Sequence, residues 1–402
     1  MSKRTTYLLG EICDDVAMGP FGSNLKVDNF ISEGVPVIRG MNLHEGGFNK
    51  KNFAFVSEEK ANSLKRCLAY PDDLVFTHRG TLGQVGIIPR IGFEKYLVSQ
   101  SQMRLSVNKK YLDPKYLYYF FKSSLGQKEL LKNSSQVGVP AIANPTKSLK
   151  EVEITIPSIA IQREVSSILS SLDSKIDLII QMNKTLETMG STLFKEWFVN
   201  FNFAGSDGKL IKGLPLGWKK GRLGEEFNIV MGQSPPGESY NEIGQGTVFY
   251  QGRTDFGFRF PENRIYTTAP NRMAEKLDTL VCVRAPVGDL NMAIERCCIG
   301  RGLSAVRHNS GAYSYTFYSM KNIENIFKGF ESEGTIFGSI NKTNFENIET
   351  IIPEKRVIQK FEKLVNSIDE KILNNSFELQ YLTQIKNSLL PQLMNGKIEV
   401  KA

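Results

Sequence analysis

The side chains best suited to chemistry in this sequence are arginines, asparagines, glutamines and serines that stand beside glycines. They gather in short stretches of both halves of the chain, at residues 19–24, 39–42, 77–81, 99–102, 232–234, 251–254, 284–286 and 300–302. Arginine can donate two hydrogen bonds to guanine, and asparagine or glutamine can pair with adenine, whereas backbone amides and lysines hold phosphates. Glycine lets the backbone approach a ligand closely. These stretches therefore predict loops that contact nucleic acid.

A glycine beside an arginine is often no more than a turn, so the residue types alone carry little weight. The recurrence of the pattern in both halves favours the DNA interpretation. The candidate DNA-binding residues are Gly22, Ser23, Asn24, Arg39, Asn42, His78, Arg79, Thr81, Ser101, Gln102, Gln233, Ser234, Gln251, Arg253, Thr254, Arg284 and Arg301.

An adenine methylase would need a glycine-rich cofactor loop and a catalytic tetrapeptide of Asn, Pro, Pro and an aromatic residue. The nearest string, Asn144-Pro145-Thr146-Lys147, lacks the second proline and the aromatic ring that would hold a target base. We interpret this string as a turn. The second half does not repeat it, because the register shared by the two halves places Asn341 opposite Pro145.

A nuclease would need carboxylates and a lysine around a metal ion. Pro71-Asp72 is not followed at short range by an acidic-x-Lys triplet, and the Asp-x-Lys strings at Asp173 and Asp369 fall within predicted helices. A solvated helix face explains those two strings. The sequence contains no G-x-x-x-x-G-K-[ST] phosphate loop, and its cysteines and histidines lack metal-ligand spacing. It predicts a non-catalytic chain with no metal and no cofactor of its own.

The composition is that of an ordinary globular protein. The chain has 402 residues, 41% of them hydrophobic, which predicts two or three domains. Its 50 Lys and Arg against 42 Asp and Glu give a net charge of +8, which favours acidic partners, although many basic proteins bind none. The five cysteines include no C-x-x-C pair, and no apolar run has the length of a signal peptide or membrane span. We expect a cytoplasmic protein with reduced thiols and no membrane association.

The chain contains a tandem repeat, which predicts architecture more firmly than a single motif does. A shift of 196 positions aligns one long block of each half without a gap. The matches include Leu149 with Phe345, Val152 with Ile348, Ile156 with Ile352, Pro157 with Pro353, Val165 with Phe361, Leu172 with Ile368, Asp173 with Asp369, Ile176 with Ile372, Leu186 with Leu382 and Leu193 with Leu389.

Upstream of this block the repeat is weaker and its offset drifts, as insertions in loops on a shared framework would produce. The matching strings are Leu9-Gly10-Glu11 with Leu223-Gly224-Glu225, Met18-Gly19 with Met231-Gly232, and Arg79-x-x-x-Gly83 with Arg284-x-x-x-Gly288. Each half therefore has a variable first part and a uniform second part.

The uniform parts predict long helices of about 35 to 40 residues, or roughly 55 Å at 1.5 Å per residue. Pro157 and Pro353 suit their starts, and Pro391 with Gly396 is expected to end the second. Helices of this length are usually spacers or coiled coils. The predicted apolar face of the first helix consists of Ile161, Val165, Ile168, Leu172, Ile176, Ile179, Leu186, Met189, Leu193 and Trp197.

The variable parts predict an α+β fold, with strand-like runs at residues 73–77, 152–156 and 279–283 between glycine-rich loops. One helix is well marked, because Asp113 can cap it and Pro114 can take its first position. Its aromatic run, residues 116–121, could be a base-stacking platform, but packing in a core is the better interpretation.

Two asparagines interrupt the apolar faces of the long helices. Asn183 stands where the second helix has Leu379, and Asn375 stands where the first has Ile179. In an antiparallel pair with twofold pseudosymmetry about residue 181, these amides would face each other and fix the register, as a buried polar pair does in coiled coils. The alternative is that one or both lie at the wet edge of the face.

The organisation resembles the specificity (S, HsdS) subunits of type I restriction-modification systems, over nearly the whole chain. The first half departs from the pattern, because it lacks the Pro-x-Gly-Trp opening of the second. The strings that carry the resemblance are Leu193-Phe194-Lys195-Glu196-Trp197-Phe198-Val199-Asn200-Phe201, Leu214-Pro215-Leu216-Gly217-Trp218-Lys219, Ile156-Pro157, Ile352-Pro353 and Leu389-Leu390-Pro391-Gln392-Leu393-Met394-Asn395-Gly396.

The resemblance implies two globular α+β target-recognition domains, joined by two long helices that form an antiparallel coiled coil with an internal pseudo-twofold repeat. The expected boundaries are 1–157 and 204–353 for the recognition domains and 158–203 and 354–402 for the helical regions. Each domain would read one half of a split, asymmetric site in double-stranded DNA. An antiparallel pair would place the half-sites roughly 34 Å apart, about one DNA turn.

The resemblance also implies partners that supply the chemistry. Two methylase (M) subunits would dock on the helices and use S-adenosylmethionine, and restriction (R) subunits would use ATP and Mg²⁺ to cut unmodified DNA. The main alternative is a solitary sequence-specific DNA-binding regulator with no methylase partner. An enzyme acting alone and a coiled-coil scaffold without a DNA role are weaker alternatives.

Overall fold

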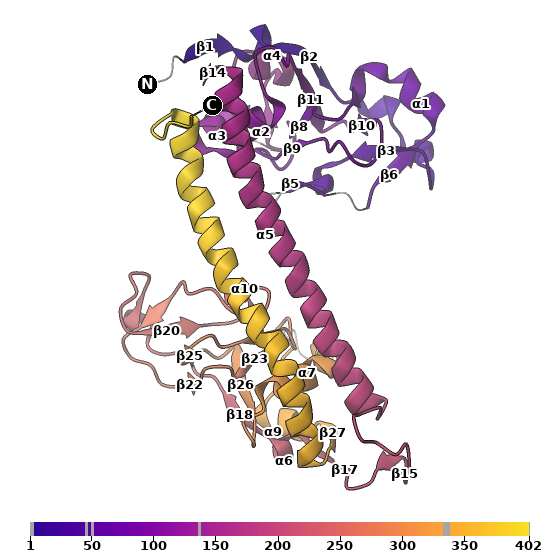
Figure 1. Cartoon of the computed structure of the whole chain (residues 1–402), viewed down its shortest axis with the longest axis vertical. Coiled ribbons are helices and arrows are strands. Elements are labelled where there is room, and N and C mark those ends of the chain that lie inside the picture. The colour runs from indigo at the N-terminus through magenta and orange to yellow at the C-terminus, as the bar shows by residue number, and fades with distance from the viewer. Residues whose placement is uncertain (1–3, 45–46, 50–51, 136–137, 333–337, 402) are drawn as a thin grey trace. The chain divides into compact units, whose positions relative to one another are not determined.

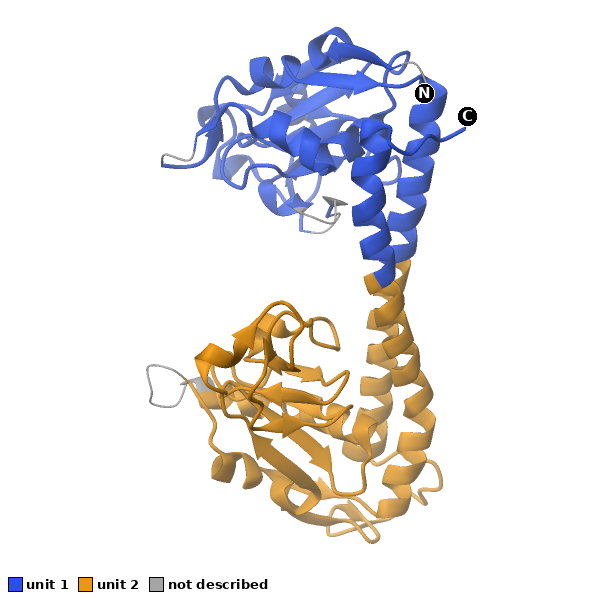
Figure 2. Ribbon diagram, turned by 90° about the vertical axis from the view of Figure 1, so that its left-hand side faces the viewer, with its two compact units in different colours: residues 1–176, 381–402 blue, residues 177–380 orange. Residues whose placement is uncertain are grey.

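A computed structural model describes residues 4–44, 47–49, 52–135, 138–332 and 338–401. The chain forms two compact units, shown in separate colours in Figure 2. Unit 1 comprises Met1–Ile176 and Tyr381–Ala402, and unit 2 comprises Asp177–Gln380. Each unit thus holds one variable half of the sequence and part of both long helices. The predicted α+β class is confirmed, since each unit combines sheets with helices (Figure 1).

The two long helices are α5 (Ile159–Phe194, 36 residues) and α10 (Lys355–Asn395, 41 residues), close to the predicted length. A π-helical turn, Lys195–Val199, continues α5. Pro391 and Gly396 were together predicted to end the second helix, and only Gly396 does so, because α10 continues past Pro391 to Asn395. The helix ends at Gly396, whose φ of 75° breaks the helical path.

Within each unit the two helices run antiparallel. In unit 1, Val165 and Leu169 of α5 share a core with Leu393 of α10. In unit 2, the Phe194 and Phe361 rings lie 5.8 Å apart. Two residues of the predicted apolar face were assigned wrongly, since Ile168 is 37% and Met189 48% exposed. Their neighbours Leu169 and Gly190 are buried instead, because a 3.6-residue turn shifts the buried side along the helix.

The buried asparagine pair is confirmed. Nδ2 of Asn375 donates to Oδ1 of Asn183 at 2.7 Å, and it lies 3.3 Å from the Met182 sulfur. Asn183 is 2% and Asn375 1% exposed, so the interpretation that they lie at a wet edge is wrong. The polar contact fixes which residues of α5 and α10 face each other inside unit 2.

Unit 1 contains two four-stranded sheets, ordered β2-β11-β8-β9 and β6-β3-β10-β7, and the short pairs β1-β14, β12-β13 and β4-β5. The strands are β1 (Thr5–Leu8), β2 (Cys13–Met18), β3 (Val35–Ile38), β4 (Leu43–His44), β5 (Gly47–Phe48), β6 (Ala54–Val56), β7 (Leu68–Ala69), β8 (Leu74–Thr77), β9 (Val85–Ile87), β10 (Tyr96–Val98), β11 (Gln102–Val107), β12 (Ser134–Ser135), β13 (Ala141–Ile142) and β14 (Glu153–Ile156).

Unit 2 repeats this plan with the sheets β18-β26-β23-β24 and β19-β21-β20-β25-β22, and with the pairs β15-β16 and β17-β27. Its strands are β15 (Leu210–Ile211), β16 (Leu214–Pro215), β17 (Lys219–Arg222), β18 (Phe227–Met231), β19 (Tyr240–Asn241), β20 (Thr247–Tyr250), β21 (Tyr266–Thr267), β22 (Met273–Ala274), β23 (Thr279–Cys282), β24 (Leu290–Met292), β25 (Cys297–Ile299), β26 (Leu303–His308) and β27 (Glu349–Ile352).

The repeat identified in the sequence is visible in the pairing of these strands. In unit 1, β3 and β10 are parallel, and in unit 2 the equivalent pair β20 and β25 is parallel too. Glu11 accepts a hydrogen bond from the backbone N–H of Leu8, and Glu225 accepts the same bond from Arg222. The glutamates occupy the positions that the sequence matched. The predicted strand runs at 73–77, 152–156 and 279–283 correspond to β8, β14 and β23.

The shorter helices pack on the sheets. Those of unit 1 are α1 (Glu58–Ser63), α2 (Pro114–Lys122), α3 (Ser124–Leu131) and α4 (Pro145–Lys150), and those of unit 2 are α6 (Leu223–Glu226), α7 (Tyr313–Asn322), α8 (Glu324–Ser332) and α9 (Lys342–Glu346). The string at Asn144 begins the helix α4 and is therefore not merely a turn. The second half has a counterpart, because Asn341 caps α9 by accepting from the Asn344 N–H at 2.9 Å.

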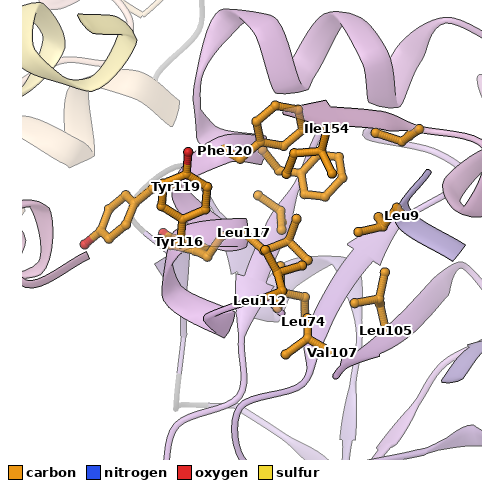
Figure 3. Packing of buried hydrophobic residues seen from close by; sticks show 14 of the residues in the cluster. Leu9, Leu74, Leu105, Val107, Leu112, Tyr116, Leu117, Tyr119, Phe120 and Ile154 are labelled. Carbon is orange, nitrogen blue, oxygen red and sulfur yellow. The ribbon is translucent and has the colours of Figure 1, made fainter. Parts of the chain in front are cut away.

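Helix α2 was predicted correctly. Asp113 accepts from the Tyr116 N–H at 2.9 Å, with Pro114 in the first turn. The aromatic run is buried, and Figure 3 shows Tyr116 and Phe120 among the core side chains. The run is therefore core packing, and its rings offer no stacking platform for bases.

The equivalent helix of unit 2 is capped from a different element. Helix α7 has Ala312 at its cap position, and Glu362 of α10 accepts from the N–H groups of Ser314 and Tyr315 at 3.1 and 3.0 Å. In unit 1 the residue in the register of Glu362 is Ser166, which donates to Asp113 at 2.8 Å. The capping carboxylate thus belongs to the recognition domain in unit 1 and to the long helix in unit 2. Burial raises the pKa of Glu362 in the folded protein above its value in the unfolded chain. The stability of unit 2 that depends on this group therefore decreases as the pH rises through the raised pKa.

The carboxylates at Asp173 and Asp369 do not lie on a solvated helix face, and that interpretation is wrong. Asp369 is 4% exposed, and Asp173 accepts hydrogen bonds from Tyr119 and Lys386. Both aspartates accept a hydrogen bond from a tyrosine hydroxyl. The donor is Tyr119 of α2 in unit 1 and Tyr318 of α7 in unit 2. The repeat thus places the same hydrogen bond between sheet-packed helix and long helix in each unit.

The asparagine pair predicts a non-additive response to mutation. Asn375→Ala leaves the buried Asn183 amide without its partner and should lower the free energy of unfolding by about 1–3 kcal/mol. The double variant Asn183→Leu/Asn375→Leu removes both amides and should lose less, or gain stability. Chemical denaturation of the full chain measures both. The pairing would be contradicted if the double variant lost as much free energy of unfolding as Asn183→Leu and Asn375→Leu lose separately, added together.

The exchanged caps predict a rescue. Asp113→Ala should lower the stability of unit 1 by about 1 kcal/mol, because α2 loses its cap. Adding Ser166→Glu should restore part of the loss, since it copies the arrangement of Glu362 in unit 2. Ser166→Glu alone is the control and should destabilise, because it brings two carboxylates together. Thermal unfolding is the measurement, and absence of rescue would show that the two caps are not interchangeable.

Candidate nucleic-acid interface

The four predicted loops of the first half come together in unit 1. The Gly19 N–H donates to the Gln102 carbonyl at 2.9 Å, and the His78 N–H donates to the Ser101 carbonyl at 3.0 Å. A third bond, from the Ser99 N–H to the Ile38 carbonyl at 2.9 Å, ties in the loop at residue 39. We call residues 19–24, 39–43, 77–84 and 99–102 loop cluster 1.

Glycine is required at one point of this cluster. A Cβ atom on Gly19 would lie 1.9 Å from the Ser99 carbonyl oxygen, where no side chain fits. The close approach holds the loop after β2 against the loop before β11. This glycine is therefore needed by the framework of the cluster, whatever the neighbouring residues bind.

Three of the predicted DNA-binding side chains are buried within loop cluster 1. Asn42 is 0% exposed and its Oδ1 accepts from the Arg39 N–H at 3.0 Å. His78 is 6% exposed, and its Nε2 lies 3.1 Å from the Gln100 carbonyl, to which it can only donate. Burial lowers the pKa of His78, which opposes a charged ring that could attract phosphate. Both side chains hold the loops and present no surface for a base.

The third buried side chain, Gln102, belongs to a network that was not predicted. It accepts from Ser99 Oγ, and its Nε2 lies 3.4 Å from Thr77 Oγ1. Thr77 in turn donates to Gln84 Oε1 at 2.8 Å, and Gln84 donates to the Leu43 carbonyl. Gln84 directly follows Gly83, which ends the matched string at Arg79, so its position beside a glycine was a signal that the candidate set left unused.

The other candidates of loop cluster 1 lie at its surface. Gly22, Ser23, Asn24, Arg79 and Thr81 are exposed, and Arg39 and Ser101 are half-buried. The Arg39 side chain donates to the Asn52 carbonyl at 3.1 Å. The structure therefore brings together polar side chains from four separate loops and leaves several of them open to a ligand.

Unit 2 builds the same framework from the second set of loops. The Gly232 N–H donates to the Leu303 carbonyl, the Val283 N–H to the Gly302 carbonyl and the Gly300 N–H to the Tyr250 carbonyl, at 2.9, 2.9 and 2.8 Å. A Cβ on Gly232 would lie 2.2 Å from the Gly300 carbonyl oxygen, as one on Gly19 would against Ser99. We call residues 232–234, 250–255, 283–288 and 300–303 loop cluster 2.

The candidates of loop cluster 2 are mostly exposed. Gln233, Gln251, Arg253, Thr254, Arg284 and Arg301 are exposed, and Ser234 is half-buried. Arg253 forms an ion pair with Asp289, which holds its guanidinium near the loop. Asp255, which sequence reasoning missed, is buried and accepts from the Gln251 N–H at 2.7 Å and from Arg264 at 2.6 Å. These two aspartates set the shape of the loop that carries the candidates.

Arg79 and Arg284 are equivalent in the structure, as the repeat predicted. Each follows a central strand, and each forms an isolated β-bridge, with Ala141 and Ser339 respectively. Both side chains are exposed, and neither forms an ion pair with a residue that the structure describes. Within the part of the chain that the structure describes, both guanidinium groups therefore remain available to an anion or a base.

This chain is similar in sequence to a known protein family and to several of its members. Residues 6–188 match the family model "Type I restriction modification DNA specificity domain". The putative type I restriction enzyme MjaX specificity subunit of Methanocaldococcus jannaschii is 29% identical over 381 residues, which cover 92% of this chain and 88% of the relative. The type I restriction enzyme HindI specificity subunit of Haemophilus influenzae is 24% identical, over 76% of this chain and 82% of the relative.

The chain is similar over most of its length to type I restriction enzyme specificity subunits. Its fold agrees with that of a family member, since the crystal structure of a type I restriction-modification system S subunit from M. genitalium covers 98% of this chain and 96% of its own at a TM-score of 0.65 and 19% identity. The resemblance found in the sequence is confirmed. The domain boundaries expected from it stay predictions.

Outside the loop clusters, three further features of the described residues bear on chemistry and location. Among the described residues, no group of three or more His, Cys, Asp or Glu side chains is arranged to hold a metal ion. None of the described helices has the length and apolar composition needed to cross a membrane. Burial raises the pKa of the Cys282 thiol to about 12 and raises that of Cys297 as well, which keeps both thiols protonated.

Substitution of the two exposed arginines tests whether the loop clusters recognise DNA. Arg79→Ala and Arg284→Ala should each weaken recognition of a different half of the target by about 1–3 kcal/mol while leaving thermal stability unchanged. Binding to target duplexes with single-base changes measures this. Arg90→Ala and Arg296→Ala remove exposed arginines outside the loop clusters and serve as controls. Equal weakening on all sequences would mean phosphate contact only, and unaltered binding would remove these arginines from the interface.

Proposed function

We propose that this specificity subunit reads a bipartite, asymmetric DNA target, with loop cluster 1 contacting one half-site and loop cluster 2 the other. One observation carries the proposal. The same backbone hydrogen bonds form in both units, but the exposed residues that they present differ in type. Two identical frames with different surfaces are what a single chain needs to read two different sequences.

The buried members of the clusters take a positioning role in this proposal. Asn42, His78 and Gln102 hold the loops of cluster 1, and the contacts to bases come from the exposed set. In cluster 1 that set includes Ser23, Asn24 and Arg79, and in cluster 2 it includes Gln251 and Arg284. Loops that buried side chains already hold in one conformation lose less conformational entropy when they bind, which favours specific recognition.

The chemistry belongs to partners of this chain. Two methylase subunits would supply S-adenosylmethionine-dependent methylation of adenine, and restriction subunits would supply ATP- and Mg²⁺-dependent cleavage. The long helices offer a surface for the methylases, because α5 keeps Leu178 and Met189 55% and 48% exposed. A shallow groove of about 530 Å³ lies beside Met189 and is lined by Lys184, Thr185, Thr188, Thr192 and Leu193. Both helices contribute to each unit, so their length would set the spacing of the half-sites.

The alternative function, a solitary DNA-binding regulator, has less support. The relatives described above bear names of specificity subunits and match this chain over most of its length. An unpartnered apolar surface on a long helix also fits a docking role better than an isolated regulator.

Reconstitution tests the proposed function. The isolated chain should bind duplex DNA weakly with an affinity that falls steeply with salt, because its net charge of +8 favours phosphate contacts. Co-purification with the methylase subunits of its own system should raise both affinity and sequence discrimination. Methylome sequencing of a host carrying the intact and the deleted gene identifies the target. Methylation by the purified chain alone, with S-adenosylmethionine supplied, would overturn the proposal.

A further inference from the structure

An arginine in unit 2 is buried against both long helices. Arg259 follows the exposed candidates of loop cluster 2 in the chain and is 1% exposed. A buried guanidinium is unfavourable unless every charge and donor is matched. The residues that match it show what its burial achieves.

Three acceptors surround the Arg259 guanidinium. Its Nε and Nη2 donate to Oε2 of Glu187 on α5 at 3.2 and 3.1 Å, and its Nη1 donates to Oδ1 of Asp369 on α10 at 3.0 Å. Nη2 also donates to the Tyr318 hydroxyl at 3.2 Å. The guanidinium carbon lies 3.7 Å from the centre of the Phe317 ring. One side chain therefore joins α5, α10 and α7.

Charge and space in this cluster are matched to the arginine. Lys321 pairs with the second oxygen of Glu187, so two cations face two carboxylates. Gly190 of α5 leaves room for the ring of Tyr318, because a Cβ at that position would lie 2.2 Å from the hydroxyl oxygen. Lysine could keep the charge of Arg259 but could not make the planar fork of contacts.

The backbone of Arg259 is joined to the candidate residues of loop cluster 2. The Met292 N–H donates to its carbonyl at 2.9 Å, and the Asn291 amide donates to the Gly257 carbonyl at 3.0 Å. At the other end, Asp255 accepts from the Gln251 N–H, and the Glu262 N–H donates to the Asp255 carbonyl at 2.8 Å. Residues 251–262 thus form one braced segment, with Gln251, Arg253 and Thr254 at its exposed end and Arg259 at its buried end.

The corresponding aspartate of unit 1 has a different cation. Asp173 accepts from Tyr119, as Asp369 accepts from Tyr318, but it pairs with Lys386 of α10 itself. Lys386 belongs to no loop of the recognition domain. In unit 1 the ion pair joins the two long helices, and in unit 2 it joins both helices to a segment that carries candidate DNA-binding residues.

We propose that Arg259 is a positioning residue for DNA recognition, which fixes the segment 251–262 on the helix pair so that its exposed end meets the second half-site in one orientation. The inference rests on the proposed function and adds a residue that makes no DNA contact itself. Loosening Arg259 should therefore relax the choice of bases at one half-site only.

The test uses the complete methylase complex reconstituted with variants of this chain. Arg259→Lys and Tyr318→Phe should each reduce discrimination between the target and single-base variants of the second half-site by about fivefold or more, where tenfold corresponds to 1.4 kcal/mol. Discrimination at the first half-site should stay at the wild-type level. Methylation rates on duplexes with single-base changes give both values.

Controls separate positioning from a general loss of stability. Lys386→Met weakens the matching ion pair of unit 1 and should leave discrimination at both half-sites unchanged. Arg284→Ala shows which half of the target is read by unit 2, because its loss should change the base preference in that half only. If Arg259→Lys yields no folded complex, Tyr318→Phe, which removes one oxygen atom, still gives the answer.

The outcomes distinguish this inference from the proposed function. If Arg284→Ala and Arg79→Ala change no base preference, the proposed function fails. If they do, and Arg259→Lys and Tyr318→Phe leave the second half-site as selective as in the wild type, only the role of Arg259 is overturned. Equal relaxation at both half-sites would also overturn it, because that result indicates general loosening of the chain.

Discussion

A hydrogen bond to a carboxylate on a long helix, buried at Asp369 and half-buried at Asp173, is the contact on which the rest of each unit depends. Asp173 and Asp369 each accept a hydrogen bond from a tyrosine of the recognition domain. A long helix buries one side against its partner helix and another against a sheet-packed helix, and apolar ridges that fit into several successive grooves do not by themselves select one register. A polar atom that must be matched permits only one position. The tyrosine-aspartate bond thus fixes where α2 or α7 lies on its long helix, and the loop clusters are built on the sheets that those helices cover.

The repeat made much of the fold predictable. Matching apolar positions over one unbroken register indicated two long helices, and the position of the asparagines within that register predicted their hydrogen bond. The errors arose where burial depends on tertiary neighbours. Ile168 fits an apolar periodicity but is exposed, because Leu169 takes the place facing α10. Pro391 lies inside α10, where its missing N–H removes one hydrogen bond of the helix. The loss falls in the last turns of the helix, whose end is held by the Arg4 side chain, which donates to the carbonyls of Leu393 and Met394.

The candidate site was predictable at the level of loops and not at the level of side chains. Glycine next to polar residues identified the loops that meet in each unit, because close backbone contact excludes a Cβ at Gly19 and Gly232. The direction of each side chain was not available from residue type. Asn24 and Asn42 are both asparagines on such loops, yet one is exposed and the other caps a turn inside the protein. Gln84 and Asp255 were missed for a related reason, since residue type does not show that a side chain supports its own loop, as Gln84 does through Thr77 and Asp255 through Arg264.

The separation of supporting from presenting residues explains how one frame can carry two surfaces. The bonds that hold each cluster together run between backbone atoms, such as Gly19 with Gln102 and Gly232 with Leu303, or come from buried side chains such as Asn42, so they do not depend on the exposed side chains. A change at Asn24 or Gln251 alters what a cluster offers to a ligand and breaks none of these bonds. The exchanged helix caps show the same tolerance deeper in the fold, because a carboxylate from Asp113 in one unit and from Glu362 in the other accepts from the N–H of an equivalent tyrosine, Tyr116 or Tyr315. What each unit must keep is a matched set of partners, and which element supplies each partner is free to differ.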